Sequence, residues 1–228
     1  MRTSRLEAFS DGVLAIIITI MVLELREPVH SDLASLWHTT GPGLLSYLLS
    51  FVYVGIYWTN HHHMFQLTAR VTGGILWANL ALLFLLSLFP FTTQWMETTR
   101  YARTPVVVYG VNLLLAALAY YVLQTVIIAA QGRDSALRKA IGTDVKGKIS
   151  PVFYIAGALA ALLGGGGHGA ARPGIWIAVA CYVGAALMWV IPDRRIERSV
   201  ETTDPAGPEA GPEAGPEAGS LGDASHYG

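Results

Sequence analysis

Long apolar stretches with few charges fill most of the first 192 residues of the chain, and short polar segments separate them. A helix that crosses the roughly 30 Å hydrocarbon core of a bilayer needs about 20 mostly apolar residues. Six stretches reach or approach that length, at about 5–25, 43–61, 71–97, 104–131, 150–164 and 173–192. The pattern predicts an all-α, polytopic membrane protein with six transmembrane helices and no soluble domain between them.

Prolines and small residues predict the ends of helices and how closely they pack. Pro90 stands near the end of the third stretch, where we expect a kink or a stop because proline lacks a backbone N–H. The fifth stretch ends in the turn Gly164–Gly167, and the sixth begins at Pro173. Small side chains in the last two stretches predict close helix packing, and these are Gly157, Ala160, Gly184 and Ala185.

Composition narrows the class of protein. Hydrophobic residues make up 53% of the chain and charged residues 14%, against about 45–50% and 25% in soluble domains. A nucleic-acid-binding surface and a wholly disordered chain are therefore excluded as interpretations. The single cysteine, Cys181, excludes an intrachain disulfide and a four-thiolate zinc site.

Charge is distributed unevenly along the chain. Residues 199–228 contain six acids, no Lys or Arg, and three Gly-Pro-Glu-Ala repeats, which predicts a disordered acidic tail after a six-helix domain at 1–198. With six spans, the side that holds both termini carries 11 Lys and Arg residues, and the other side carries 4. The positive-inside rule predicts that both termini are cytoplasmic.

The first predicted helix is the unusual one, because Asp11 and Glu24 bound its apolar stretch with only 12 residues between them. An ionisable group at that depth is costly against lipid and normally faces a bundle interior, a partner or water. The alternative is a structural Asp11, hydrogen-bonded at the interface. The stretch is apolar all round, so periodicity does not choose its inner face. One seam at 3–4 spacing contains Val13, Ile16, Ile20 and Leu23, and Thr19 lies one residue off it.

The second predicted helix ends with a polar group that contains Trp58, Asn60 and the three histidines His61, His62 and His63. Consecutive helical residues point about 100° apart, so three adjacent histidines do not converge on a metal ion. We therefore expect no metal and no cofactor. This group and the pair Arg5 and Asp11 fall on one side of the membrane, where they can make contact.

Familiar signatures of other membrane proteins are missing. The sequence holds no T-V-G-Y-G filter, no arginine-repeat voltage sensor and no C-x-x-C-H haem motif. Two alternatives to a channel stay open. One is a secondary transporter, proton-coupled through Asp11 and the histidines. The other is a membrane haem or metal enzyme that uses His61–His63.

Two motifs resemble the transmembrane protein 175 family of endosomal and lysosomal potassium channels. The first is R-x-x-x-F-S-D-G-V running into A-I-x-x-T-I, which here includes Arg5, Phe9, Ser10 and Asp11. The second is the ending of the second helix, with Trp58, Asn60, His61, His62 and Phe65. Asn79 and Pro90-Phe91 resemble the family's third helix. The resemblance covers residues 1–198.

This resemblance implies a potassium-selective, passive cation channel rather than an enzyme. A chain with one set of six helices resembles the bacterial members, which form homotetramers in the cell membrane. Four first helices would line the central pore, with an apolar constriction that conducts when it is wetted. The pore positions are Ile16, Thr19, Ile20 and Leu23. The group Arg5, Phe9, Ser10 and Asp11 would be braced by Trp58, Asn60, His61 and His62. Apart from the resemblance, Glu24 and Glu27 suggest either an acidic vestibule at the outer mouth or solvated charges at the helix end.

Overall fold

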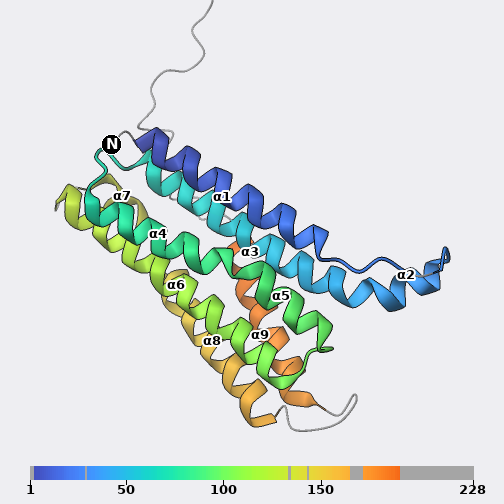
Figure 1. Cartoon of the computed structure of the whole chain (residues 1–228). Coiled ribbons are helices and arrows are strands. Elements are labelled where there is room, and N and C mark those ends of the chain that lie inside the picture. The colour runs from blue at the N-terminus through green and yellow to red at the C-terminus, as the bar shows by residue number, and fades with distance from the viewer. Residues whose placement is uncertain (1–2, 29, 133–134, 143, 165–171, 191–228) are drawn as a thin grey trace, which may run out of the picture.

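The computed structural model describes residues 3–28, 30–132, 135–142, 144–164 and 172–190, and every regular element in these ranges is a helix (Figure 1). Within them, six helical segments are long and apolar enough to cross a membrane. The predicted all-α, six-span architecture is confirmed. Two other predictions, the tail at 199–228 and the glycines at 165–167, lie outside the described residues.

The spanning segments are α1 (Thr3–Leu23), α3 (Gly41–Gln66), α4 with α5 (Gly73–Ser87 and Phe89–Thr98), α6 (Arg103–Gln131), α8 (Val145–Gly164) and α9 (Pro173–Val190). Two short helices, α2 (Leu33–Thr39) and α7 (Ala136–Ile141), occupy loops where the sequence predicts no element. They are too short to show a helical period. Side-chain caps begin each of them, because Asp32 accepts from the Ser35 N–H and Ser135 accepts from the Arg138 N–H.

The third span breaks where Pro90 predicts it. Helix α4 ends at Ser87 and α5 begins at Phe89, with Leu88 between them. Pro90 lies in the first turn of α5, where its missing N–H costs nothing. The fifth span differs from its prediction, since α8 begins at Val145 and includes Pro151. Asp144 accepts a hydrogen bond from the Gly147 N–H at 3.1 Å and so caps this extra turn.

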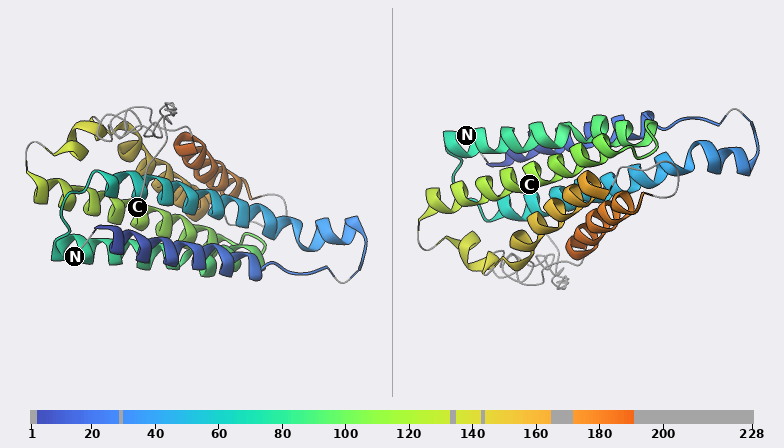
Figure 2. Two further views of the ribbon diagram at one scale, coloured as in Figure 1. Left: turned by 90° about the horizontal axis from the view of Figure 1, so that it is seen from above. Right: turned by 90° about the horizontal axis from the view of Figure 1, so that it is seen from below.

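The helices form a bundle in which α1 and α9 lie on opposite sides (Figure 2). Helix α1 packs against α3, α4 and α5, whereas α6 packs against α4, α5, α8 and α9. Helices α8 and α9 form a tightly packed hairpin. Helix α3 contacts both α1 and α9, so one side of α3 supports the first helix and another side supports the last.

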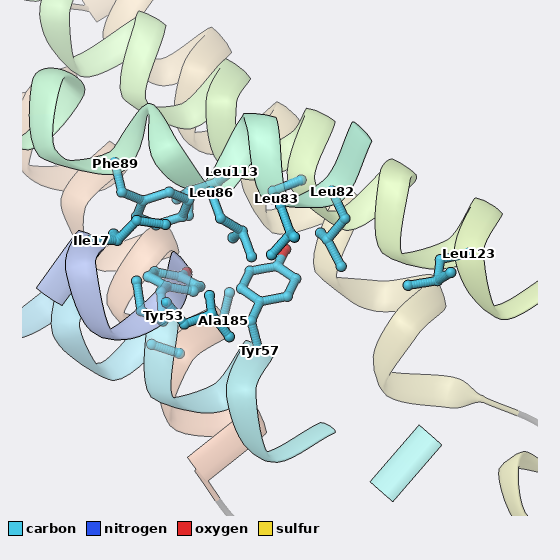
Figure 3. Packing of buried hydrophobic residues seen from close by; sticks show 14 of the residues in the cluster. Ile17, Tyr53, Tyr57, Leu82, Leu83, Leu86, Phe89, Leu113, Leu123 and Ala185 are labelled. Carbon is cyan, nitrogen blue, oxygen red and sulfur yellow. The ribbon is translucent and has the colours of Figure 1, made fainter. Parts of the chain in front are cut away.

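Aromatic and branched apolar side chains fill the core, among them Tyr53, Leu82, Leu86 and Leu113 (Figure 3). Small residues let the helices around Tyr182 approach each other. A Cβ at Gly157 would lie 2.5 Å from the Tyr182 ring, and one at Gly110 would overlap its hydroxyl group. The predicted close packing of the last two helices is confirmed at Gly157, whereas Gly110 belongs to α6.

Candidate functional site

Helix α1 has two faces of different character. One face is buried against α3, α4 and α5 and repeats every three or four residues, as Leu6, Ser10, Leu14, Ile17 and Met21. The other face exposes large apolar side chains, which include Phe9, Ile16, Ile20 and Leu23. Since the helix is apolar all round, its packing against the bundle decides which residues stay uncovered.

A buried chain of hydrogen bonds joins α1 to α3 and α4. The Nε2–H of His61 donates to the Oδ1 of Asn79 at 2.8 Å, and the Asn79 amide donates to the Ser10 hydroxyl at 3.0 Å. Ser10 in turn donates to the Leu6 carbonyl at 2.9 Å. All three side chains are at least 98% buried. Unpaired polar groups cost several kcal/mol in a membrane interior, so these bonds hold α1 at one rotation and one depth.

A second, less buried group of contacts is made by Glu7 and Asp11, which flank Ser10 along α1. The Trp58 indole N–H donates to Asp11 Oδ1 at 3.0 Å, and His62 Nδ1 lies 2.5 Å from Glu7 Oε1. The amide of Gln66 bonds the other ring nitrogen of His62 at 2.9 Å. Asp11 therefore has a hydrogen-bonding partner on α3, as the structural interpretation of this residue expects.

The structure does not bring every predicted residue into these contacts. Arg5 is exposed, and Phe9 is 51% exposed on the same uncovered face as Ile16. Asn60 donates to the Ile56 carbonyl of its own helix at 2.8 Å, and its own carbonyl accepts from the Tyr120 hydroxyl on α6. Asn60 thus faces α6, because it is rotated about 100° from His61 around α3.

Three residues of this site are absent from the predicted bracing group, and these are Glu7, Gln66 and Asn79. Glu7 carries a weak signal, since it stands one turn before Asp11 and therefore on the same face. Asn79 is an amide inside a strongly apolar stretch, a position that in membrane helices favours a polar partner on a neighbouring helix. Sequence spacing does not identify that partner.

Within the apolar stretch between Asp11 and Glu24, the uncovered face of α1 offers one hydroxyl, that of Thr19. Ile16 is 58% exposed and Leu23 is 82% exposed. Thr19 is also exposed, and its hydroxyl donates to the Ile16 carbonyl at 2.9 Å. Because the hydroxyl proton is directed to the helix backbone, the lone pairs of Oγ1 remain available to a hydrogen-bond donor or a cation outside the helix.

At the far end of α1, Glu24 interacts with Glu97 of α5. Burial, and secondarily the Glu97 carboxylate, raise the pKa of Glu24 above its ordinary value. Glu27 is exposed. The acidic pair at this end therefore combines Glu24 with Glu97, whereas the sequence suggested Glu24 with Glu27.

The adjacent histidines have separate partners. His61 turns inward to Asn79, and His62 turns to Glu7. In the part of the chain that the structure describes, no three His, Cys, Asp or Glu side chains come together to hold a metal ion.

Six spanning helices, with a first helix anchored through buried polar contacts, define a polytopic α-helical membrane protein. Residues 5–90 match the profile of the family described as endosomal/lysosomal potassium channel TMEM175. The chain is 50% identical over 201 residues to potassium channel HX13_20290 of Chryseobacterium sp. (strain P1-3), covering 88% of this chain and 99% of that protein. It is 34% identical over 128 residues to potassium channel B446_29190 of Streptomyces collinus, covering 53% and 62%.

A solved structure shares the fold. The crystal structure of a lysosomal potassium-selective channel TMEM175 homolog from Chamaesiphon minutus superposes with a TM-score of 0.66 at 28% identity. The match covers 85% of this chain and 97% of that one. The chain belongs to the TMEM175 family. This is a family of ion channels and not of enzymes.

Proposed function

We propose that this chain forms a passive potassium channel, built from four copies in the cell membrane with both termini in the cytoplasm. Residues 1–198 would be the channel domain, and potassium the permeant ion, with no bound cofactor. The names of the bacterial relatives and of the solved homologue support the potassium assignment. The excess of Lys and Arg on the terminal side supports the orientation.

The observation that carries the proposal is the two-faced first helix. Its inner face is anchored through Ser10, whereas its outer face exposes apolar residues along the whole span. Four such faces around one axis would enclose a path across the membrane. Rings of Ile16 and Ile20 would form its apolar constriction, with Leu23 toward the outer end, and such a ring gates by wetting and dewetting.

Thr19 supplies the polar layer in this arrangement. Its hydroxyl oxygen keeps lone pairs available on the uncovered side, since the proton is donated to Ile16. Oxygen lone pairs are the ligands that replace water around an alkali cation in a selective pore. We assign Thr19 to cation coordination beside the constriction.

The bracing contacts explain how a narrow pore could keep its dimensions. Asp11 and Glu7 are held by Trp58 and His62 at one end of α1, and Ser10 is held by Asn79. The Ser10 contact lies on the buried side of the helix, and the Glu7 and Asp11 contacts lie beside it, so both sets would position α1 without entering the pore.

The decisive experiment is the reversal potential of the purified protein in a planar bilayer, with potassium on one side and equimolar sodium on the other. A non-zero potential with the sign for potassium, and a current linear in driving force, would support the proposal. A zero potential with sizeable current would mean a non-selective pore and would remove the role given to Thr19. Saturating flux that requires a proton gradient would instead indicate the secondary transporter.

A further inference from the structure

An apolar groove of about 370 Å³ runs between α3 and α9, on the side of α3 that α1 does not occupy. Its walls include Leu45, Val52, Trp176, Val183 and Leu187, and Tyr101 lies at one end. Pockets that hold small organic ligands measure roughly 300–1,000 Å³. The groove is thus large enough for a substantial apolar ligand and independent of the proposed pore.

The groove lies at membrane depth. Both walls belong to spanning helices, and Trp176 and Leu187 on its rim are 58% and 61% exposed. Within the described residues, no further helix of the chain covers it. Water molecules in the groove would make few hydrogen bonds with its apolar walls, so an apolar ligand is the more favourable occupant.

One end of the groove is basic. Arg172 donates from its two terminal nitrogens to the backbone carbonyls of Tyr101 and Arg100, each at 3.1 Å, and this fixes its guanidinium beside the groove. The Arg100 side chain is exposed at the same end. The acid Glu97 also lies near Tyr101, and its carboxylate packs against Gly43 of α3 while interacting with Glu24 and Arg26.

The aromatic pair Tyr101 and Trp176 indicates the depth of this end in the membrane, and their ring centroids are 6.2 Å apart. Tyrosine and tryptophan concentrate where the hydrocarbon core meets the headgroups. The N-terminus of α9, at Pro173, lies beside the same arginines and adds the positive end of a helix dipole. An apolar trough that ends in fixed positive charge at headgroup level suits an amphiphile with an anionic end.

We propose that this groove binds a phospholipid with an acidic headgroup. One acyl chain lies along α3 and α9 between Leu45 and Leu187, and the headgroup phosphate is held by Arg100 and Arg172. Guanidinium groups favour phosphate oxygens because they can donate two parallel, charge-assisted hydrogen bonds to them. A second copy of the chain is the competing occupant.

Photolabelling of the full-length protein in phosphatidylcholine nanodiscs tests the site, with a phosphatidylglycerol probe that carries a diazirine in its acyl chain. We expect label on the peptides of α3 and α9 that line the groove, displaced by phosphatidylglycerol in preference to phosphatidylcholine. Val183→Trp fills the groove and should abolish this label. Ile177→Trp places the same ring elsewhere on α9, at a residue that does not line the groove, and should keep the label.

A separate variant tests the contact between the lipid headgroup and the arginines. Arg100→Gln should lower the preference for phosphatidylglycerol about fivefold, the change expected from one basic side chain at an anionic surface. Arg70→Gln, an exposed arginine at the start of α4, should leave the preference unchanged. An unchanged preference in Arg100→Gln would overturn the assignment of the headgroup.

Two outcomes would overturn the whole proposal. One is absence of lipid label from the groove in wild-type protein. The other is efficient cross-linking of a photoreactive residue at position 183 to another copy of the chain. Potassium flux through the same preparations is recorded separately, so loss of the lipid site and failure of the proposed channel function remain distinguishable.

Discussion

Asn79 on α4 donates a hydrogen bond to Ser10 on α1 at 3.0 Å, across 69 residues of sequence. The same amide accepts a hydrogen bond from His61 on α3. One buried side chain therefore joins three spanning helices, and it orients the helix whose opposite face carries Ile16 and Thr19. The exposed face of α1, which we propose lines the pore, is therefore positioned by contacts on the opposite, buried face.

Replacing Asn79 with leucine should destabilise the protein strongly. The change leaves the His61 Nε2–H without an acceptor in a buried region, which costs about 1–3 kcal/mol. It also removes the hydrogen bond that Ser10 accepts, although Ser10 still donates to the Leu6 carbonyl. Asn60→Leu is the matched control, because Asn60 bonds only the backbone of its own helix through its amide. Thermal unfolding in detergent should show a clearly lower Tm for Asn79→Leu than for Asn60→Leu. Equal melting temperatures would contradict the anchoring role.

Ile16→Asn should raise basal potassium flux. An amide in the apolar ring favours water in the constriction, and a wetted constriction conducts. Leu118→Asn places the same side chain at an exposed position on α6, and we expect flux near the wild-type value. Rubidium uptake into proteoliposomes measures both. Unchanged flux in a folded Ile16→Asn tetramer would remove Ile16 from the gate.

Thr19→Val should reduce selectivity for potassium over sodium while leaving the fold intact. Valine matches threonine in shape but has no hydroxyl oxygen to coordinate a cation. Thr125→Val on α6 is the control, since Thr125 makes the same kind of bond to a carbonyl three residues earlier. Reversal potentials in mixed potassium and sodium should shift toward zero for Thr19→Val alone. A shift of equal size in Thr125→Val would point to a general effect on packing.

Acidification on the Glu24 side should lower conductance at low potassium concentration. Because the pKa of Glu24 is raised, its carboxylate takes up a proton at a higher pH than an ordinary glutamate does as the pH falls. Losing that charge removes an attraction for cations near the end of α1. Glu24→Gln should show the lowered conductance already at neutral pH and respond less to acid. Glu27→Gln, at an exposed site, should keep the wild-type pH response.

Gly157→Ala should destabilise the α8–α9 hairpin. The added Cβ would lie 2.5 Å from the Tyr182 ring and 3.2 Å from the Ala178 carbonyl oxygen. Overpacking of this kind typically costs about 1–3 kcal/mol. Gly55→Ala meets nothing within 4 Å on α3 and should be neutral or slightly stabilising, since alanine is the better helix former. Tm values of the two variants would separate, and similar values would contradict the close packing at Gly157.

The sequence alone determined the architecture of the membrane domain. Six apolar stretches, the break at Pro90 and the basic terminal side are local properties of composition, because a bilayer imposes length and hydropathy on every segment that crosses it. The resemblance in the first two helices also identified the family. It included five residues that make hydrogen bonds between helices in the structure, namely Ser10, Asp11, Trp58, His61 and His62. The sequence did not predict short helices such as α2, because one or two turns are too short to show the hydrophobic period of a helix.

Only the tertiary structure decided which residues face each other. Helix α1 is apolar on every side, so no pattern within it separates Ile17, which is buried, from Ile16, which is exposed. Along α3, His61 turns to α4 and Asn60 to α6, although they are neighbours in sequence. The direction in which each side chain faces depends on contacts between helices that lie far apart in the chain, such as Ser10 with Asn79. A hydrophobic pattern along the sequence does not indicate which distant residues come into contact.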